Sequence, residues 1–341
     1  MLKVQRVVVW GLGAMGSGMV KDILNKPKME LVGAIETLRK ELDGKTLEEH
    51  LKIKSKITIS SDPEKVISET DPDVVLIATT SFVPKVFPMI KVAVEHSANV
   101  ITLAEEMSYP WLDYPELSHR MDSLAKKHEV SILGTGVNPG FVLDTLILTL
   151  TGVCLNVEKI KAQRINDLSP FGAEVMRTQG VGTSVEEFKR GIKDGSIVGH
   201  IGFRQSIAMI ADALGWKIER IEEEREPIVS NTHRETPYVK VEPGQVAGCR
   251  HIGRGIVDGD VKIELVHPQQ IHPELENVKT GDFVQIEGDP NLSMEIKPEI
   301  PGGKGTMAMA VNMIPAVVTA RPGLLTMKDM PIPHGVLNAR R

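Results

Sequence analysis

A glycine-rich turn near the start of the chain places the strongest constraint on its fold. Gly11, Gly13 and Gly16 form the pattern Gly-x-Gly-x-x-Gly. The preceding segment, Val4–Trp10, is short and rich in valine, which is typical of a strand buried on both faces. The following segment, Ala14–Leu24, carries apolar residues at helical spacing. The turn therefore predicts the strand–turn–helix unit of a parallel α/β sheet.

The same turn indicates a dinucleotide cofactor. The first glycine permits the tight turn, the second lets a pyrophosphate approach the backbone, and the third lets the helix pack on the strand. Free N–H groups of Ala14 and Met15 would meet the phosphates at the positive end of the helix. Glu36 follows Gly16 by twenty residues and ends a second predicted strand, Glu30–Glu36, where a carboxylate would accept hydrogen bonds from ribose hydroxyls.

Two residues bear on which nicotinamide cofactor is used. The negative charge of Glu36 disfavours the 2′-phosphate of NADP, and so favours NAD. Arg39 lies three residues further on, and its guanidinium is able to pair with that phosphate. We therefore expect NAD as the cofactor, with NADP as the open alternative.

The rest of the first half alternates between strand and helix patterns. Further strands are predicted at Ile57–Ser60, Asp73–Ala78, Asn99–Leu103 and Val130–Leu133, and helices at Asp62–Glu69, Pro84–His96 and Pro115–Lys127. Strands that alternate with helices predict an α/β fold, a doubly wound parallel sheet of the Rossmann type with right-handed crossovers.

The pattern changes at the Gly- and Pro-rich segment Gly134–Gly140. We place a boundary there, with a dinucleotide-binding domain over 1–137 and a substrate-binding and dimerisation domain over 138–302. The second region begins with a predicted helix, Phe141–Leu150, and continues with strands at Lys159–Asn166, Lys217–Glu226, Gly248–Asp258, Val261–Val266, Phe283–Glu287 and Leu292–Ile296 and helices at Glu186–Asp194 and Gln205–Leu214. This order predicts an α+β domain with a mostly antiparallel sheet. A last predicted helix, Gly302–Arg321, returns to the first domain, which residues 303–341 complete.

Composition excludes several other classes of protein. The chain has 341 residues, of which 41% are hydrophobic and 25% charged, as in globular proteins with two domains. Neither a run of about 20 apolar residues nor a signal peptide is evident. Two cysteines are too few for a disulfide framework, and a net charge of −5 with scattered basic residues gives no nucleic-acid surface. We expect a cytoplasmic protein that binds neither membrane, nucleic acid nor metal.

Polar side chains follow two strands of the predicted sheet, at the edge where ligands of such sheets bind. Thr79, Thr80 and Ser81 follow the fourth strand, and their small hydroxyl side chains suit the lining of a cofactor site. Glu105 and Glu106 follow the fifth strand. One of these carboxylates could act as a general base or hold a cationic amine. The alternative is that both cap the next segment or face solvent.

Missing motifs narrow the reaction further. The chain has no Tyr-x-x-x-Lys pair, no lysine after the fifth strand, and no Gly-x-Ser-x-Gly elbow. His267 and His272 are five residues apart and do not have zinc-ligand spacing. A site built around a carboxylate, without lysine or zinc, suits an amine or iminium substrate.

Several residues of the second region are candidate substrate ligands. Asn138 lies in the boundary loop, and Arg164 and Asn166 end the first strand after it. An arginine there could hold a substrate carboxylate through two hydrogen bonds. His200 lies in the glycine-flanked segment Val-Gly-His-Ile-Gly, and His267 precedes a proline. For each histidine the alternative is an ordinary hydrogen bond within the core or at the surface.

Five segments together carry a resemblance to a known family. They are Trp10–Gly18, Ile101–Pro110, Gly134–Leu146, Gln163–Asp167 and the tail that begins at Gly302. The chain resembles the 2,4-diaminopentanoate dehydrogenase family, whose members have a dihydrodipicolinate-reductase-like N-terminal domain and whose relatives include native amine dehydrogenases. The resemblance covers the whole chain, and its Glu-Glu-Met-x-Tyr-Pro and Asn-Pro-Gly-Phe motifs are specific. The His-His…Lys signature of dihydrodipicolinate reductase itself is absent.

The resemblance implies NAD(P)-dependent oxidative deamination of 2,4-diaminopentanoate to 2-amino-4-oxopentanoate and ammonia, within anaerobic ornithine breakdown. It implies that Glu105 is the catalytic carboxylate and that Asn138, Arg164, Asn166 and His200 lie near the substrate. From its position next to Glu105, we expect Glu106 to bind the substrate as well. Two alternatives stay open. One is another NAD(P)-dependent reductase, of the dihydrodipicolinate reductase or homoserine dehydrogenase type, acting on a small imine or carbonyl compound. The other is an NAD-binding sensor without catalysis.

The oligomeric state is the last expectation. Exposed strands of an antiparallel sheet often pair across a two-fold axis. We therefore expect a homodimer formed through the second domain.

Overall fold

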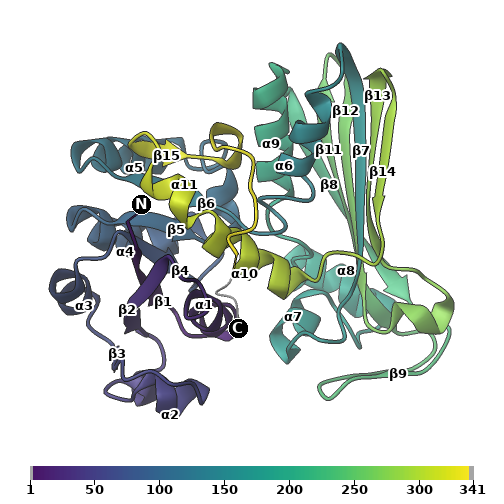
Figure 1. Ribbon diagram of the computed structural model, residues 1–341. Coiled ribbons are helices and arrows are strands. Elements are labelled where there is room, and N and C mark those ends of the chain that lie inside the picture. Colours follow the sequence, from purple (N-terminus) through teal and green to yellow (C-terminus); the bar gives the residue numbers. More distant parts are fainter. Residues whose placement is uncertain (1–2, 338–341) are drawn as a thin grey trace. The chain divides into compact units, whose positions relative to one another are not determined.

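The chain folds into two units, shown in Figure 1. The computed structural model describes residues 3–337. One unit combines the chain up to Phe141 with the chain from Gly302 onward, and the other is Val142–Pro301. The division after Phe141 falls four residues beyond the boundary placed after residue 137, so Asn138 belongs to the first unit. The reason is local, because Val137 N–H donates to the Thr306 hydroxyl at 3.3 Å and ties the loop to the first unit.

A seven-stranded sheet forms the centre of the first unit. Its strand order is β15-β6-β5-β4-β1-β2-β3, and every pair is parallel. The strands are β1 (Gln5–Trp10), β2 (Met29–Ile35), β3 (Ile59–Ser60), β4 (Val74–Ile77), β5 (Asn99–Thr102), β6 (Ser131–Gly134) and β15 (Gly323–Leu325). All four residues of β4 are fully buried, because helices cover both faces of the sheet. The predicted doubly wound parallel sheet is confirmed.

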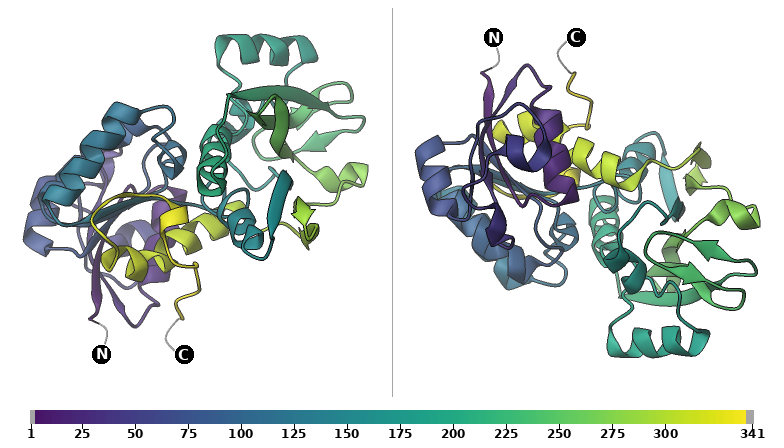
Figure 2. Two further views of the ribbon diagram at one scale, coloured as in Figure 1. Left: turned by 90° about the horizontal axis from the view of Figure 1, so that it is seen from above. Right: turned by 90° about the horizontal axis from the view of Figure 1, so that it is seen from below.

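Helices on both faces of this sheet can be followed in Figures 1 and 2. They are α1 (Ala14–Ile23), α2 (Leu47–Leu51), α3 (Pro63–Thr70), α4 (Val83–Glu95) and α5 (Pro115–Lys127). Their starts have local causes. For example, Asp62 accepts a hydrogen bond from Lys65 N–H at 3.0 Å and Pro63 occupies the first turn of α3. Within residues 3–337 none of the helices combines the length and the apolar character needed to cross a membrane.

The C-terminal segment differs from its prediction. The single helix expected over Gly302–Arg321 is wrong, because the structure has two helices there, α10 (Gly302–Asn312) and α11 (Ile314–Val318). Pro315 lies in the first turn of α11 and has no N–H to continue the hydrogen bonds of α10, so the helix breaks before it. The chain then forms β15, an edge strand that the sequence did not reveal, which pairs with β6.

The second unit contains a six-stranded sheet with the order β14-β13-β7-β12-β11-β8. The strands are β7 (Asn156–Asp167), β8 (Arg220–Val229), β11 (Val246–Val257), β12 (Asp260–Gln270), β13 (Gly281–Asp289) and β14 (Leu292–Ile296). Four of the five neighbouring pairs are antiparallel, and β7 and β12 are parallel. The predicted mostly antiparallel sheet is therefore confirmed. Strand β8 begins and ends three residues later than predicted for Lys217–Glu226.

The described helices of the second unit are α6 (Thr145–Thr151), α7 (Ala173–Thr178), α8 (Val185–Asp194) and α9 (Phe203–Leu214). Of these, α9 packs closely against β11 of the sheet. The prediction of a helix from Phe141 is wrong at its start, because the Asp144 carboxylate caps Thr145 N–H at 2.5 Å. Gly253 and Gly255 of β11 let α9 approach, since a Cβ on Gly253 would lie 2.9 Å from the ring of Phe203.

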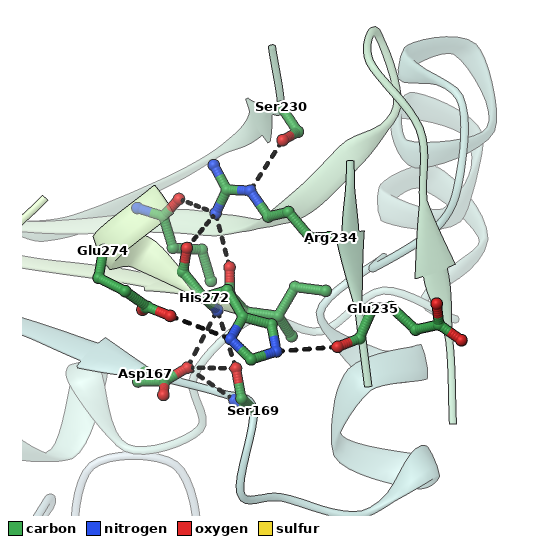
Figure 3. A network of polar contacts seen from close by, with 9 residues as sticks. Asp167, Ser169, Ser230, Arg234, Glu235, His272 and Glu274 are labelled. Atoms are coloured by element: carbon green, nitrogen blue, oxygen red, sulfur yellow. Dashed lines mark hydrogen bonds and ion pairs between the residues drawn. The ribbon is translucent and has the colours of Figure 1, made fainter. Parts of the chain in front are cut away.

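A buried arginine joins separate segments of the second unit (Figure 3). Arg234 begins the short hairpin of β9 (Arg234–Glu235) and β10 (Lys240–Val241), and its side chain is fully buried. Its guanidinium donates to Ser230 Oγ at 2.8 Å and to the Ile271 carbonyl at 2.6 Å, and it forms an ion pair with Glu276 at 2.7 Å. A buried charge with this many partners fixes the hairpin to the loop that follows β12.

Arg234→Ala should lower the free energy of unfolding by about 3–5 kcal/mol, because it leaves several buried acceptors and Glu276 without their partner. The measurement is urea denaturation followed by circular dichroism. Arg220→Ala, which removes an exposed arginine of β8, is the control and should cost less than about 0.5 kcal/mol. Equal effects of the two substitutions would contradict this assignment.

Candidate active site

The turn between β1 and α1 has the geometry of a phosphate-binding loop. Gly11 has φ +95°, and a Cβ there would lie 2.5 Å from the Ala78 carbonyl oxygen. A Cβ on Gly16 would lie 1.7 Å from the Gly11 carbonyl oxygen, so both positions require glycine. Around Gly13, by contrast, there is open space beside an exposed backbone. The residues present therefore fit a dinucleotide, whose pyrophosphate must approach the backbone closely.

The first turn of α1 completes this loop. Gly13 precedes the helix, Ala14 is exposed, and Met15 is half-buried next to Gly303 of α10. The first N–H groups of a helix have no acceptor within the helix, and the helix dipole makes this end positive. Leu12, 1% exposed, anchors the loop in the core. The arrangement leaves backbone donors at the surface while the loop itself stays rigid.

Glu36 lies where β2 ends and is 3% exposed. One of its oxygens accepts from Leu12 N–H at 3.0 Å and from the Arg39 guanidinium, and the other accepts from Leu38 N–H at 3.0 Å. Burial alone would raise the pKa of this carboxyl, but the Arg39 guanidinium and the backbone N–H groups outweigh burial and lower the pKa to about 2. Glu36 is thus a fixed anion that ties the glycine turn to the end of β2.

Thr79, Thr80 and Ser81 follow β4 next to the same turn. The Thr79 methyl group packs against Gly11, and the Thr79 hydroxyl contacts Met89 Sδ at 3.1 Å. The Thr80 hydroxyl accepts from Phe82 N–H at 3.4 Å. The Ser81 hydroxyl interacts with the Glu105 carboxylate and lowers its pKa. These three residues therefore lie between the glycine turn and Glu105, although Thr79 and Thr80 are also engaged within the protein.

Glu105 begins the short helix η2 (Glu105–Ser108) directly after the end of β5, and its side chain is half-buried. Burial raises the pKa of this carboxyl, the Ser81 hydroxyl lowers it, and the neighbouring charge of Glu106 raises it again. The net shift is upward. A carboxylate with a raised pKa, at the sheet edge that carries the glycine turn, accepts a proton more readily than an ordinary glutamate does.

Glu106 has a structural position rather than the predicted place beside a substrate. One of its oxygens accepts from Val83 N–H at 2.8 Å at the start of α4, and the other accepts from the Tyr114 hydroxyl at 3.2 Å. Both oxygens thus have partners within the protein. The first N–H groups of a helix need acceptors from outside the helix. Phe82, the N-cap residue of α4, makes no side-chain hydrogen bond to the helix, and the Glu106 carboxylate serves as the acceptor for Val83 N–H instead.

Asn138 follows β6 in the first unit and is half-buried. Its neighbour Val137 is bound to Thr306 of α10. Thr306, which the sequence did not single out, is close to Gly136, whose Cβ would lie 3.7 Å from the Thr306 side chain. The tail motif Gly-Gly-Lys-Gly-Thr at the start of α10 was the available signal for this residue.

Arg164 is bound to other groups of the protein, and its role as the holder of a substrate carboxylate stays a prediction. The guanidinium is 2% exposed and donates to Asp282 and to the Ile300 carbonyl. Asp282 is fully buried and also accepts from Ile300 N–H at 2.9 Å. A guanidinium of β7 facing a carboxylate of the neighbouring strand β13 is satisfied by that carboxylate.

Three histidines gather around Phe203 in the second unit. The His200 ring lies 4.9 Å from that of His267 and 5.1 Å from that of Phe203, and Phe203 lies 4.8 Å from His251. His267 shares a hydrogen bond of 2.9 Å with Asn166 Oδ1, so the predicted residues Asn166 and His200 belong to one cluster. Sequence reasoning gave His267 no specific role and missed His251. The signal for His251 was its position on the face of β11 that carries Gly253.

These histidines are neutral. Burial, together with the nearby His251 and Arg164, lowers the pKa of His200 to about 3. Burial lowers the pKa of His267 in the same way. His251 Nδ1 accepts from His200 N–H at 3.0 Å, so its proton is on Nε2, which faces Glu223 at 3.1 Å. Neutral imidazoles beside an amide can donate to or accept from a polar substrate without adding charge. Within residues 3–337 His, Cys, Asp and Glu form no group of three suited to a metal ion.

Comparison with known proteins gives two family matches. Residues 141–341 match the family described as 2,4-diaminopentanoate dehydrogenase C-terminal domain. Residues 5–102 match dihydrodipicolinate reductase, N-terminus. The two matches fall on the second unit with the C-terminal segment, and on the strands β1 to β5 of the parallel sheet.

Individual relatives agree with these matches. The chain is 48% identical over 336 residues to 2,4-diaminopentanoate dehydrogenase of Acetoanaerobium sticklandii, which covers 97% of this chain and 95% of that protein. It is 26% identical to amine dehydrogenase of Streptomyces virginiae, over 95% of this chain and 96% of that protein. Among solved structures, amine dehydrogenase from Mycobacterium smegmatis superimposes with a TM-score of 0.84 at 27% identity, covering 97% of each chain.

Glu36 predicts a pH dependence of stability. Its pKa is about 2 in the fold against 4.5 for an unperturbed glutamate, so the ionised form stabilises the fold fully above pH 4.5, and this contribution disappears as the pH falls toward 2. The free-energy difference between the wild type and Glu36→Gln should therefore shrink between pH 5 and pH 3. Denaturation at several pH values measures it, with the exposed Glu41→Gln as control. A constant difference would show that the charge of Glu36 does not act in this way.

Proposed function

The chain belongs to the 2,4-diaminopentanoate dehydrogenase family, and we propose that it catalyses the NAD(P)-dependent oxidative deamination of 2,4-diaminopentanoate. The products are 2-amino-4-oxopentanoate and ammonia, and reductive amination is the reverse reaction. The observation that carries the proposal is the half-buried Glu105, a carboxyl group with a raised pKa at the sheet edge that bears the glycine turn. The chain is an oxidoreductase of the amine dehydrogenase type.

The glycine turn would hold the cofactor. Backbone N–H groups of Gly13, Ala14 and Met15 would meet the pyrophosphate, and the Glu36 carboxylate would accept from the adenosine ribose. Thr79, Thr80 and Ser81 would line the space toward the nicotinamide. When bound, the nicotinamide ring supplies the hydride acceptor for the oxidation.

Glu105 would manage the protons of the reaction. An amine must be neutral before it can lose hydride from its carbon, and the raised pKa of Glu105 lets this carboxylate take the excess proton. Once Glu105 has passed that proton to solvent, it is ionised again, and its carboxylate would stabilise the iminium ion that forms when hydride leaves. Glu105 could then take a proton from the water that adds to the iminium carbon and give that proton to the amine nitrogen, so that ammonia leaves as the adduct collapses.

Residues of the second unit would recognise the substrate. We assign this role to Asn166 and His200, and we add His267 because it shares a hydrogen bond with Asn166 and a ring contact with His200. Asn138 of the first unit is assigned to the substrate as well. Arg164 acts indirectly, since its ion pair with Asp282 fixes β7 beside β13.

Further assignments rest on the family and the sheet edge. We propose a homodimer formed through the second unit, whose edge strand β8 carries exposed residues from Glu222 to Glu224. We propose that the reaction belongs to ornithine degradation. Because amino acids and nicotinamide cofactors are cytoplasmic metabolites, the cytoplasm is its proposed location.

An absorbance assay at 340 nm tests the reaction. The purified protein is given 2,4-diaminopentanoate with NAD⁺ or with NADP⁺, and ornithine and alanine serve as control amines. Reduced cofactor that forms only with the diamine supports the proposal. No turnover with the diamine, together with turnover of a carbonyl or imine compound, would instead assign the chain to another reductase reaction.

Glu105→Gln should lower kcat by about 10²–10⁴-fold, the usual contribution of a general acid or base. Cofactor binding, followed by quenching of protein fluorescence, should be unchanged because the glycine turn is not altered. Glu116→Gln, an exposed substitution in the first turn of α5, is the control and should keep full activity. Turnover of Glu105→Gln close to that of the wild type would remove Glu105 from the mechanism.

The pairing of Arg39 with Glu36 predicts a mixed cofactor preference. We propose that NAD is preferred and NADP accepted, because the half-exposed Arg39 guanidinium can contact a 2′-phosphate while Glu36 opposes it. Arg39→Ala should raise the ratio of KM for NADP⁺ to KM for NAD⁺ about tenfold, as expected for one lost charge-assisted contact. Lys40→Ala, at the exposed next residue, is the control. An unchanged ratio would mean that Arg39 does not contact the phosphate.

A further inference from the structure

Glu106 connects two segments that follow neighbouring strands. Its backbone N–H donates to the Ser81 carbonyl at 3.1 Å. Its carboxylate accepts from Val83 N–H at 2.8 Å, two residues further along that segment. Glu106, which follows β5, thus holds both ends of the Ser81–Val83 turn that follows β4. The Tyr114 hydroxyl, which donates to the second oxygen at 3.2 Å, keeps the carboxylate from rotating.

The turn held by Glu106 carries a residue that acts on Glu105. The Ser81 hydroxyl interacts with the Glu105 carboxylate and lowers its pKa. The Glu105 carbonyl in turn accepts from Ser108 Oγ at 2.8 Å, which fixes the backbone of η2. The orientation of the Glu105 side chain therefore depends on Ser81, and the position of Ser81 depends on Glu106.

We propose that Glu106 is a positioning residue for the reaction, which holds Ser81 against the Glu105 carboxylate and places a second negative charge beside it. The inference rests on the proposed function, because it takes Glu105 to be the proton acceptor. It gives the two adjacent glutamates different tasks. Glu105 exchanges the proton, and Glu106 sets where Glu105 points and how readily it accepts that proton.

The negative charge of Glu106 changes the pKa of Glu105 in one direction. Of the described residues, Glu106 is the charged group that acts on Glu105, and it raises the pKa of Glu105 in addition to burial. Tyr114, close to Asp113, contacts Glu106. On the other side, Gly134 at the end of β6 lies against the Met107 backbone of η2 and carries no titratable group. Removal of the Glu106 charge should therefore lower the pKa of Glu105.

The test compares pH profiles of kcat/KM for the diamine in the wild type, Glu106→Gln, Ser81→Ala and Tyr114→Phe. Glu106→Gln keeps groups that can hydrogen-bond to Val83 and Tyr114 but removes the charge. Its acidic limb should move to lower pH, because a base with a lower pKa stays ionised to lower pH, and kcat at pH 7 should fall about tenfold. Ser81→Ala should lower kcat by a similar factor. Tyr114→Phe, which frees the Glu106 carboxylate to rotate, should lower kcat by a smaller factor with its acidic limb unmoved.

Glu116→Gln is the control for a lost negative charge, and its profile should match that of the wild type. A merely structural role of Glu106 would lower stability without moving the acidic limb. An unmoved limb in Glu106→Gln, or full kcat in Ser81→Ala, would overturn the proposal.

A measurement without substrate separates this inference from the proposed function. The pKa of Glu105 can be followed by 13C NMR of protein labelled at glutamate carboxyl carbons, with Glu105→Gln to identify the resonance. A lower Glu105 pKa in Glu106→Gln supports the positioning role even where the diamine is not turned over. An unchanged Glu105 pKa contradicts that role even where the diamine is the substrate.

Discussion

The close contact between α1 and β1 is the constraint on which the first unit depends. The Gly16 α-carbon lies so near the Gly11 carbonyl that a single methyl group would overlap it. This contact holds the first turn of α1 over the end of β1, and it turns Leu12 N–H toward Glu36 at the end of β2. The same turn packs against Ala78 after β4. Three strand ends therefore meet at one loop, and a ligand at that loop meets backbone N–H groups.

Buried charges set the architecture of the second unit in a comparable way. Removing a guanidinium from water costs several kcal/mol unless a carboxylate and further acceptors replace the water. Arg164 meets this requirement with Asp282, and Arg234 meets it with Glu276 and backbone carbonyls. Each pair joins segments that are more than 40 residues apart in the chain. The arginines are consequently committed to the fold, whereas the histidines around Phe203 are neutral.

The sequence predicts the regular parts of this structure well and the partners of individual polar residues poorly. The spacing of apolar residues identifies β1 to β6 and the mostly antiparallel sheet, because buried side chains recur at a spacing typical of each kind of element. It misses β15, three residues long, whose pairing with β6 depends on a distant segment. Glu106 and Arg164 were assigned to substrate because their residue types allow it. Nothing local reveals that Val83 and Asp282 already occupy them.

Glu36 and Glu105 are carboxylates at the same sheet edge, and their surroundings give them different pKa values. Glu36 faces a guanidinium and backbone donors, which lower its pKa to about 2 and keep it charged. Glu105 faces one hydroxyl and a second carboxylate, and its pKa is raised. The strand order β5-β4-β1-β2 separates them by three strand spacings, roughly 14 Å at about 4.8 Å each. Groups whose environments separate their pKa values in this way divide the work of a site. A permanent charge at one end suits recognition of a neutral sugar, and an exchangeable proton at the other end suits chemistry on an amine.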